Sequence, residues 1–264
     1  MRLMHLMLMS SMAAASPAFG ADRLTDRDVK ELVARIEEGR DRFDDALDGK
    51  LKRSIVRGPS GEVNVNDFLN DFQENIDRLE ERLKPEYAAS AEVATLLRQG
   101  SGIDRFFHQQ PPGTKGESEW NRLAADLKSL AAAYGADFPL PEGASVRRMG
   151  DREVAAAADE VARSADDLKK SLNNDLKKET TVQKTDREAI VREADQLSKD
   201  AKALRGRVRD AKPSSAEADR LLSRAAELQA FVDSHQLPTA AGVWTGIRTR
   251  LQELAGAYGA PMAR

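Results

Sequence analysis

Two aromatic pairs are the residues of this chain best suited to contact a ligand. Trp120 and Tyr134 lie 14 residues apart, and Trp244 and Tyr258 repeat that spacing later in the chain. On a helix this spacing places both aromatics on one face, where they can line a small-molecule pocket. The same spacing also suits side chains buried along the seam of a bundle. We favour core packing and keep all four residues as candidate ligand or partner contacts.

Residues that hold metals or haem are scarce. The chain has no cysteine, and the histidines outside its first twenty residues are His108 and His235. Haem and di-iron sites in helical bundles need inward-facing His or Met ligands, or Glu-x-x-His pairs on facing helices. The sequence contains no Glu-x-x-His. It therefore predicts no metal site and no cofactor, with both histidines as capping or surface residues.

Patterns for covalent catalysis are also missing from the sequence. There is no cysteine nucleophile and no Gly-x-Ser-x-Gly turn. Gly58 with Gly61, and Gly113 with Gly116, lack the Lys-Ser/Thr of a phosphate-binding loop, so we interpret both as turns. Adjacent acidic residues are common in a chain with 44 Asp and Glu, and we interpret them as solvated helix faces. We predict no catalytic residues and no enzymatic activity.

The elements that carry these residues occur twice along the chain. Residues 26–29, Asp-Arg-Asp-Val, return 125 positions later as residues 151–154, Asp-Arg-Glu-Val. Trp120 and Tyr134 return after 124 positions as the second aromatic pair. Most of the repeated residues are apolar and recur at helical spacing, which is typical of a packed helical module. We therefore predict a tandem duplication of such a module.

Composition and periodicity predict an all-α fold. Aromatic residues make up 5% of the chain and charged residues 32%, which is typical of helical bundles. Each copy contains four amphipathic segments joined by short loops, which predicts an up-down four-helix bundle. A continuous array of helical hairpins is the alternative. The helices expected in the first copy are residues 25–56, 66–83, 90–110 and 120–134.

Capping residues indicate where several helices begin and end. Thr25 is the expected N-cap of the first helix, with Asp28 three residues later, and Thr185 opens a capping box in the second copy. Gly135 and Gly259 follow the fourth helix of each copy, where a left-handed residue often ends a helix.

The predicted domain boundaries follow the repeat. Phe138 and Leu140 can dock the proline-rich segment between the copies, and we expect the neighbouring Arg147 and Arg148 to face solvent. The boundaries are residues 1–20 for a signal peptide, 21–135 for the N-terminal helical-bundle repeat, 136–150 for a Pro/Gly linker and 151–264 for the C-terminal helical-bundle repeat.

The second copy carries smaller or more polar residues at several core positions. Ala157 stands where the first copy has Leu32, and Glu193 stands where it has Phe68. Each large apolar side chain lost from a core removes about 1.5–3 kcal/mol of stabilisation. We expect the C-terminal bundle to be the less stable of the two.

The first twenty residues resemble a cleavable secretory signal peptide. Arg2 provides a positive start, an apolar stretch covers residues 6–15, and Ala18 and Gly20 suit a cleavage site before Ala21. We predict a periplasmic or secreted protein with no transmembrane segment after signal removal. Acids and bases are interleaved along a chain of net charge −3, so we predict no nucleic-acid partner.

Together these patterns predict an exported, non-enzymatic helical-bundle protein that acts in protein binding, scaffolding or chaperone-like work. The expected partner is another envelope protein, and the oligomeric state stays open. The alternative function is a small-molecule or metal carrier that uses the bundle interior, for which the four aromatic residues named above are the candidate contacts.

Overall fold

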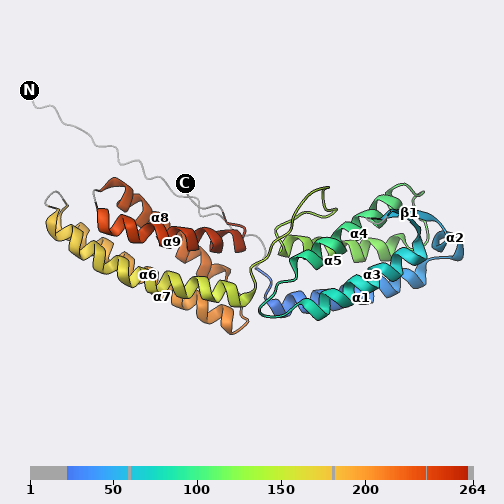
Figure 1. Ribbon diagram of the computed structural model, residues 1–264, viewed down its shortest axis with the longest axis horizontal. Coiled ribbons are helices and arrows are strands. Elements are labelled where there is room, and N and C mark those ends of the chain that lie inside the picture. Colours follow the sequence, from blue (N-terminus) through green and yellow to red (C-terminus); the bar gives the residue numbers. More distant parts are fainter. Residues whose placement is uncertain (1–22, 59–60, 180–181, 236, 261–264) are drawn as a thin grey trace, which may run out of the picture.

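The computed structural model describes residues 23–58, 61–179, 182–235 and 237–260. Within these residues the chain forms nine helices and one two-stranded β-hairpin, so the all-α prediction is confirmed (Figure 1). The predicted signal peptide, residues 1–20, lies outside the described residues. None of the described helices combines the length and the apolar character that crossing a bilayer requires.

The first half of the chain encloses one hydrophobic core. Phe43, Phe68 and Phe72 are among its largest buried side chains, and the whole seam from Val29 to Leu130 belongs to it. Its elements are α1 (Asp26–Ala46), α2 (Gly49–Lys52), β1 (Ile55–Gly58), β2 (Gly61–Asn64), α3 (Val65–Arg82), α4 (Ser90–His108) and α5 (Glu117–Ala133).

The second half encloses a separate core built from smaller side chains. Alanines such as Ala158, Ala165 and Ala201 are fully buried there, and no phenylalanine is among its described buried residues. Small side chains let helices approach closely, and α6 and α7 are the most extensively packed pair in the protein. The elements are α6 (Asp151–Lys178), α7 (Lys184–Arg209), α8 (Ser215–Ser234) and α9 (Pro238–Ala257).

Several predicted helix ends are confirmed. The Thr25 hydroxyl accepts a hydrogen bond from the Asp28 amide at 3.1 Å, and the Asp28 carboxylate accepts one from the Thr25 amide at 2.8 Å. This reciprocal pair is the expected capping box of α1. Gly135 and Gly259 adopt φ values of 67° and 62° directly after Tyr134 and Tyr258, the C-cap residues of α5 and α9.

The prediction that the first helix continues to Val56 is wrong. The α1 helix ends at Ala46, and the Asp48 carboxylate accepts hydrogen bonds from the amides of Lys50 and Leu51 to start the short helix α2. Residues 55–58 then pair antiparallel with residues 61–64. β-Branched residues lie on both sides of the Gly-Pro-Ser-Gly sequence, and this pattern favours a hairpin over a helix.

The capping box predicted at Thr185 is also wrong. The α7 helix begins one residue earlier, at Lys184, with Gln183 as its N-cap residue and no capping side chain. Thr185 therefore lies inside the first turn, where its hydroxyl contacts the carboxylate of Asp186 at 3.5 Å. A capping side chain must precede the first helical residue, so Thr185 lies two residues too late in the chain to cap α7.

The segment between the two halves packs against the first bundle. Leu140 and Val146 are buried in the first core, and Phe138 packs against it from the side. Leu140 also donates its backbone amide to the Ser101 hydroxyl at 2.8 Å. The segment is therefore a docked connection, and the chain enters α6 from a fixed position.

The two bundles lie end to end and share one junction (Figure 1). Both α1 and α6 start at the junction and run away from it in opposite directions, while α5 and α9 return toward it. The junction thus collects the N-termini of two long helices and the C-termini of two others.

Candidate functional site

The two predicted tryptophans lie inside the bundles. Trp120 is 2% exposed, and its indole Nε1 donates to Asp104 Oδ1 at 3.1 Å. Trp244 is 3% exposed, and its indole donates to the side-chain oxygen of Gln229. Each ring nitrogen has a partner and each ring is surrounded by core residues, so the structure places the tryptophans in the packing and away from open space.

The two predicted tyrosines lie at the junction, away from the tryptophans. The Tyr134 hydroxyl donates to the Ala88 carbonyl oxygen at 2.5 Å, and the Tyr258 hydroxyl lies 2.7 Å from the Ser214 hydroxyl. Burial raises the pKa of both tyrosines. The structure therefore separates each predicted aromatic pair, with the tryptophan in the bundle and the tyrosine at the point where the bundles meet.

Two arginines cross the junction and pair with carboxylates of the opposite bundle. Arg23, just before α1, places Nη1 2.6 Å from Asp151 Oδ1. Arg148, just before α6, places Nη2 2.9 Å from Asp26 Oδ1. The two arginine side chains are 6% and 2% exposed. Removing one partner of a buried charge pair of this kind strongly destabilises the folded protein, because the other charge stays buried without a partner.

The same carboxylates also join the starts of the two long helices. The Asp26 amide donates to Asp151 Oδ2 at 2.9 Å, and the Asp151 amide donates to Asp26 Oδ2 at 2.9 Å. The first amides of a helix have no partner within it and carry partial positive charge. Each aspartate therefore satisfies the helix start of the other bundle.

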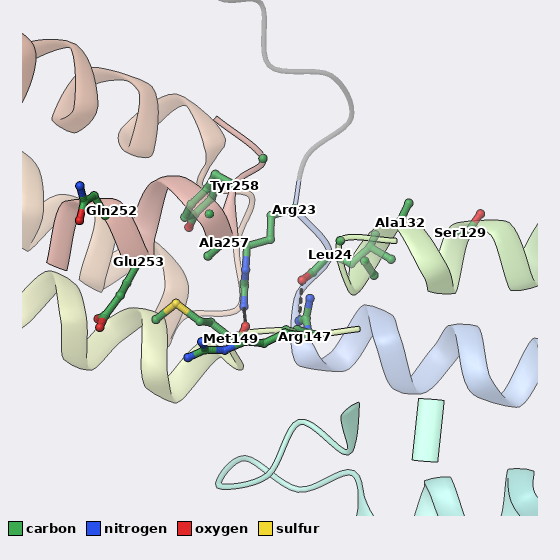
Figure 2. A pocket seen from close by; sticks show the side chains of 15 residues that line it. Arg23, Leu24, Ser129, Ala132, Arg147, Met149, Gln252, Glu253, Ala257 and Tyr258 are labelled. Atoms are coloured by element: carbon green, nitrogen blue, oxygen red, sulfur yellow. Dashed lines mark hydrogen bonds between the residues drawn. The ribbon is translucent and has the colours of Figure 1, made fainter. Parts of the chain in front are cut away.

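Each arginine makes two further contacts across the junction. Arg23 donates to the Met149 carbonyl oxygen at 2.6 Å and lies over the Tyr258 ring, 5.8 Å from its centre (Figure 2). Arg148 donates to the Leu24 carbonyl oxygen at 2.7 Å and lies 6.0 Å from the centre of the Tyr134 ring.

Every one of these junction contacts has a counterpart about 125 residues away in the sequence. The contacts cross, so that an arginine from one half always meets residues of the other half. The matched residues are Arg23 with Arg148, Leu24 with Met149, Asp26 with Asp151 and Tyr134 with Tyr258.

The expectation that Arg148 faces solvent is wrong, whereas Arg147 is exposed as expected. A sequence signal for Arg148 was present. Arg23-x-x-Asp26 returns as Arg148-x-x-Asp151 with the same offset as the rest of the repeat. When an arginine and an aspartate recur together at the same spacing in both halves, the pattern indicates that they form ion pairs in the structure.

A cleft of about 650 Å³ opens beside these contacts. In Figure 2, Ser129 and Ala132 of α5 lie on one side of it, and Gln252 and Ala257 of α9 lie on the other. Arg147 also lines the cleft and makes no ion pair within the described part of the chain. The arrangement suits binding, since none of the lining residues is a nucleophile with an adjacent base.

The described residues contain no group of three or more His, Cys, Asp or Glu side chains that could hold a metal ion. His108 Nδ1 lies 2.7 Å from the Asp104 carbonyl oxygen near the end of α4. His235 follows α8 and stacks on Phe231, with the ring centres 4.1 Å apart. Each histidine interacts with its own helix end.

Alkaline titration tests the burial of the Tyr134 hydroxyl. An unfolded tyrosine ionises near pH 10, while the folded residue holds its proton to higher pH. Stability from this group is complete below pH 10 and falls as the pH rises above it, because the unfolded chain then binds fewer protons. Tyr134→Phe is expected to reduce that fall by about 1.4 kcal/mol per pH unit in urea titrations. An unchanged slope would contradict the burial of this hydroxyl.

Comparison of the chain with protein-family models, with curated proteins and with solved structures found no match.

Proposed function

We propose that this chain is an exported, non-enzymatic scaffold that holds two helical bundles as one rod and binds other envelope proteins through its exposed surface. The observation that carries this proposal is the junction. Arg23 and Arg148 are buried there and paired with carboxylates of the opposite bundle. A flexible tether between independent domains would expose such groups to water.

The proposal includes a tandem duplication of a four-helix module. The matched contacts at the junction support this duplication, and so do matched contacts inside the two bundles. Trp120 donates to Asp104, and Trp244 donates to Gln229, which lies 125 positions after Asp104. A hydrogen bond between polar side chains of the second and third long helices is also repeated. It joins Asn75 to Gln99 in one copy and Arg224 to Asp200 in the other.

Export is proposed on the signal-peptide pattern of residues 1–20, which places the protein in the periplasm or outside the cell. Amino-terminal sequencing of the protein from the cell envelope is expected to begin at Ala21. A chain that keeps Met1 and stays in the cytoplasm would contradict this part of the proposal.

Partner binding is best tested at the far end of the first bundle. Ile55 on β1 is 59% exposed. Among the described residues, the large hydrophobic side chains that are exposed are those of Ile55 and Tyr87. A photoreactive residue at position 55 is expected to crosslink one enriched envelope protein, and Ile55→Asp is expected to abolish its capture. Glu38→Ala, at an exposed position of α1, is the matched control that retains capture.

Loss of capture with both variants, or with neither, would contradict a specific partner site. Turnover of generic ester, phosphate or peptide substrates by the purified protein would contradict the non-enzymatic assignment. The carrier alternative requires open space beside Trp120 or Trp244, and the packing of both indoles makes it the weaker proposal.

A further inference from the structure

The cleft between α5 and α9 has the size and the lining of a small-molecule site. Its volume of about 650 Å³ falls within the range of about 300–1,000 Å³ that is usual for such sites. Its walls are small and apolar, with Ala132 and Ala133 from α5 and Gly256 and Ala257 from α9. Met149 adds a flexible thioether that adapts to apolar ligands.

One cation at this cleft, Arg147, is exposed and pairs with no described carboxylate. The two crossing arginines are already paired with carboxylates. Glu253, which also lines the cleft, lies 2.9 Å from Arg250, an arginine that it shares with Glu160 at 2.5 Å. Arg147 is exposed at the cleft without an ion pair to any described residue, and the buried Nε of Arg148 has no hydrogen-bond partner in the same region. A ligand with one anionic group can pair with the exposed Arg147 guanidinium.

We propose that the cleft binds an amphipathic carboxylate, with its apolar chain between α5 and α9 and its carboxylate at Arg147. A purely apolar ligand would leave the Arg147 guanidinium uncompensated, and a cationic one would be repelled by it. This binding shares the junction with the scaffold proposal but does not require a protein partner, so ligand binding and partner capture can fail independently.

Filling the cleft is the first test. Gly256 lines the cleft, and a Cβ atom at this position would meet nothing within 4 Å, so Gly256→Leu is compatible with folding. With decanoate as the probe, the amides of Gly135 and Gly259 are expected to shift in nitrogen–proton NMR spectra of the unchanged protein. Gly256→Leu is expected to weaken decanoate binding by about tenfold or more, because the added side chain occupies the site.

Gly246→Leu is the matched control, because Gly246 is also exposed on α9 with nothing within 4 Å but does not line the cleft. It is expected to leave decanoate binding unchanged. Equal binding by Gly256→Leu and Gly246→Leu would overturn the proposed location.

The charge is tested separately. Arg147→Gln is expected to weaken decanoate binding by about threefold, because it removes one exposed ion pair. The same variant is expected to leave the affinity for decanol unchanged. Lys30→Gln, at an exposed position of α1, is the control that leaves both unchanged. If decanol or decyltrimethylammonium bound as tightly as decanoate, the choice of an anionic ligand would be overturned.

Discussion

Replacing Arg148 by methionine is expected to lower the free energy of unfolding by about 3–5 kcal/mol. Methionine keeps much of the apolar length of the side chain but leaves the Asp26 carboxylate without the cation that now lies 2.9 Å away. The arginine side chain is 2% exposed and that of Asp26 is 23% exposed, so water replaces little of the lost interaction. The Leu24 carbonyl oxygen loses its donor at the same time.

Urea unfolding followed by tryptophan fluorescence measures this effect. Arg147→Met is the matched control, because Arg147 is adjacent, exposed and without an ion pair in the described residues. Its expected effect is within about 0.5 kcal/mol. Similar losses in the Arg147 and Arg148 variants would contradict the role given to the junction.

Replacing Phe43 by alanine is expected to destabilise the first bundle by about 3–5 kcal/mol. Phe43 is fully buried, and its ring centre lies 5.3 Å from that of Phe107 and 5.5 Å from that of Trp120. The alanine variant removes these aromatic contacts and leaves a cavity that the three surrounding helices cannot close fully.

Single-tryptophan variants report which bundle unfolds. With Trp120 kept and Trp244 replaced by phenylalanine, the signal comes from the first core, and the reverse variant reports the second. Phe43→Ala is expected to move the Trp120 transition to lower urea. Leu168→Ala, 125 positions later in the second core, is expected to move the Trp244 transition. If Phe43→Ala shifted the Trp244 signal alone, the two cores would not be organised as described.

Much of the fold could be predicted because apolar spacing determines which helix face is buried. The seam from Trp120 to Leu130 and the cap at Thr25 follow from local sequence, and the structure has both. Periodicity does not predict the pairing of residues 55–58 with residues 61–64, because a short apolar run fits either a helix or a strand. The signal for strands is the β-branched set Ile55, Val56 and Val63, which lies on both sides of the Gly-Pro-Ser-Gly sequence.

The junction could not be predicted from local pattern. Arg148 pairs with Asp26, 122 residues earlier, and nothing in the sequence around Arg148 specifies that partner. Local spacing predicts Tyr134 and Tyr258 only as ends of the bundle seams. Their contacts with Arg148 and Arg23 depend on how the two halves dock. The matching Arg-x-x-Asp spacing was the one available indication, and it required comparison of the two copies.

The central claim is that the crossed arginine–aspartate pairs hold the two bundles in one fixed arrangement. The chain has no cysteine, so Glu38→Cys and Arg163→Cys place one spin label on each bundle. Both positions are exposed, and each lies about 18 Å along its helix from the junction. Pulsed electron paramagnetic resonance is expected to give one narrow distance distribution, which broadens when Arg23 and Arg148 are both replaced by methionine. A broad distribution in the labelled protein with both arginines intact, or one that the double replacement leaves unchanged, would contradict the claim.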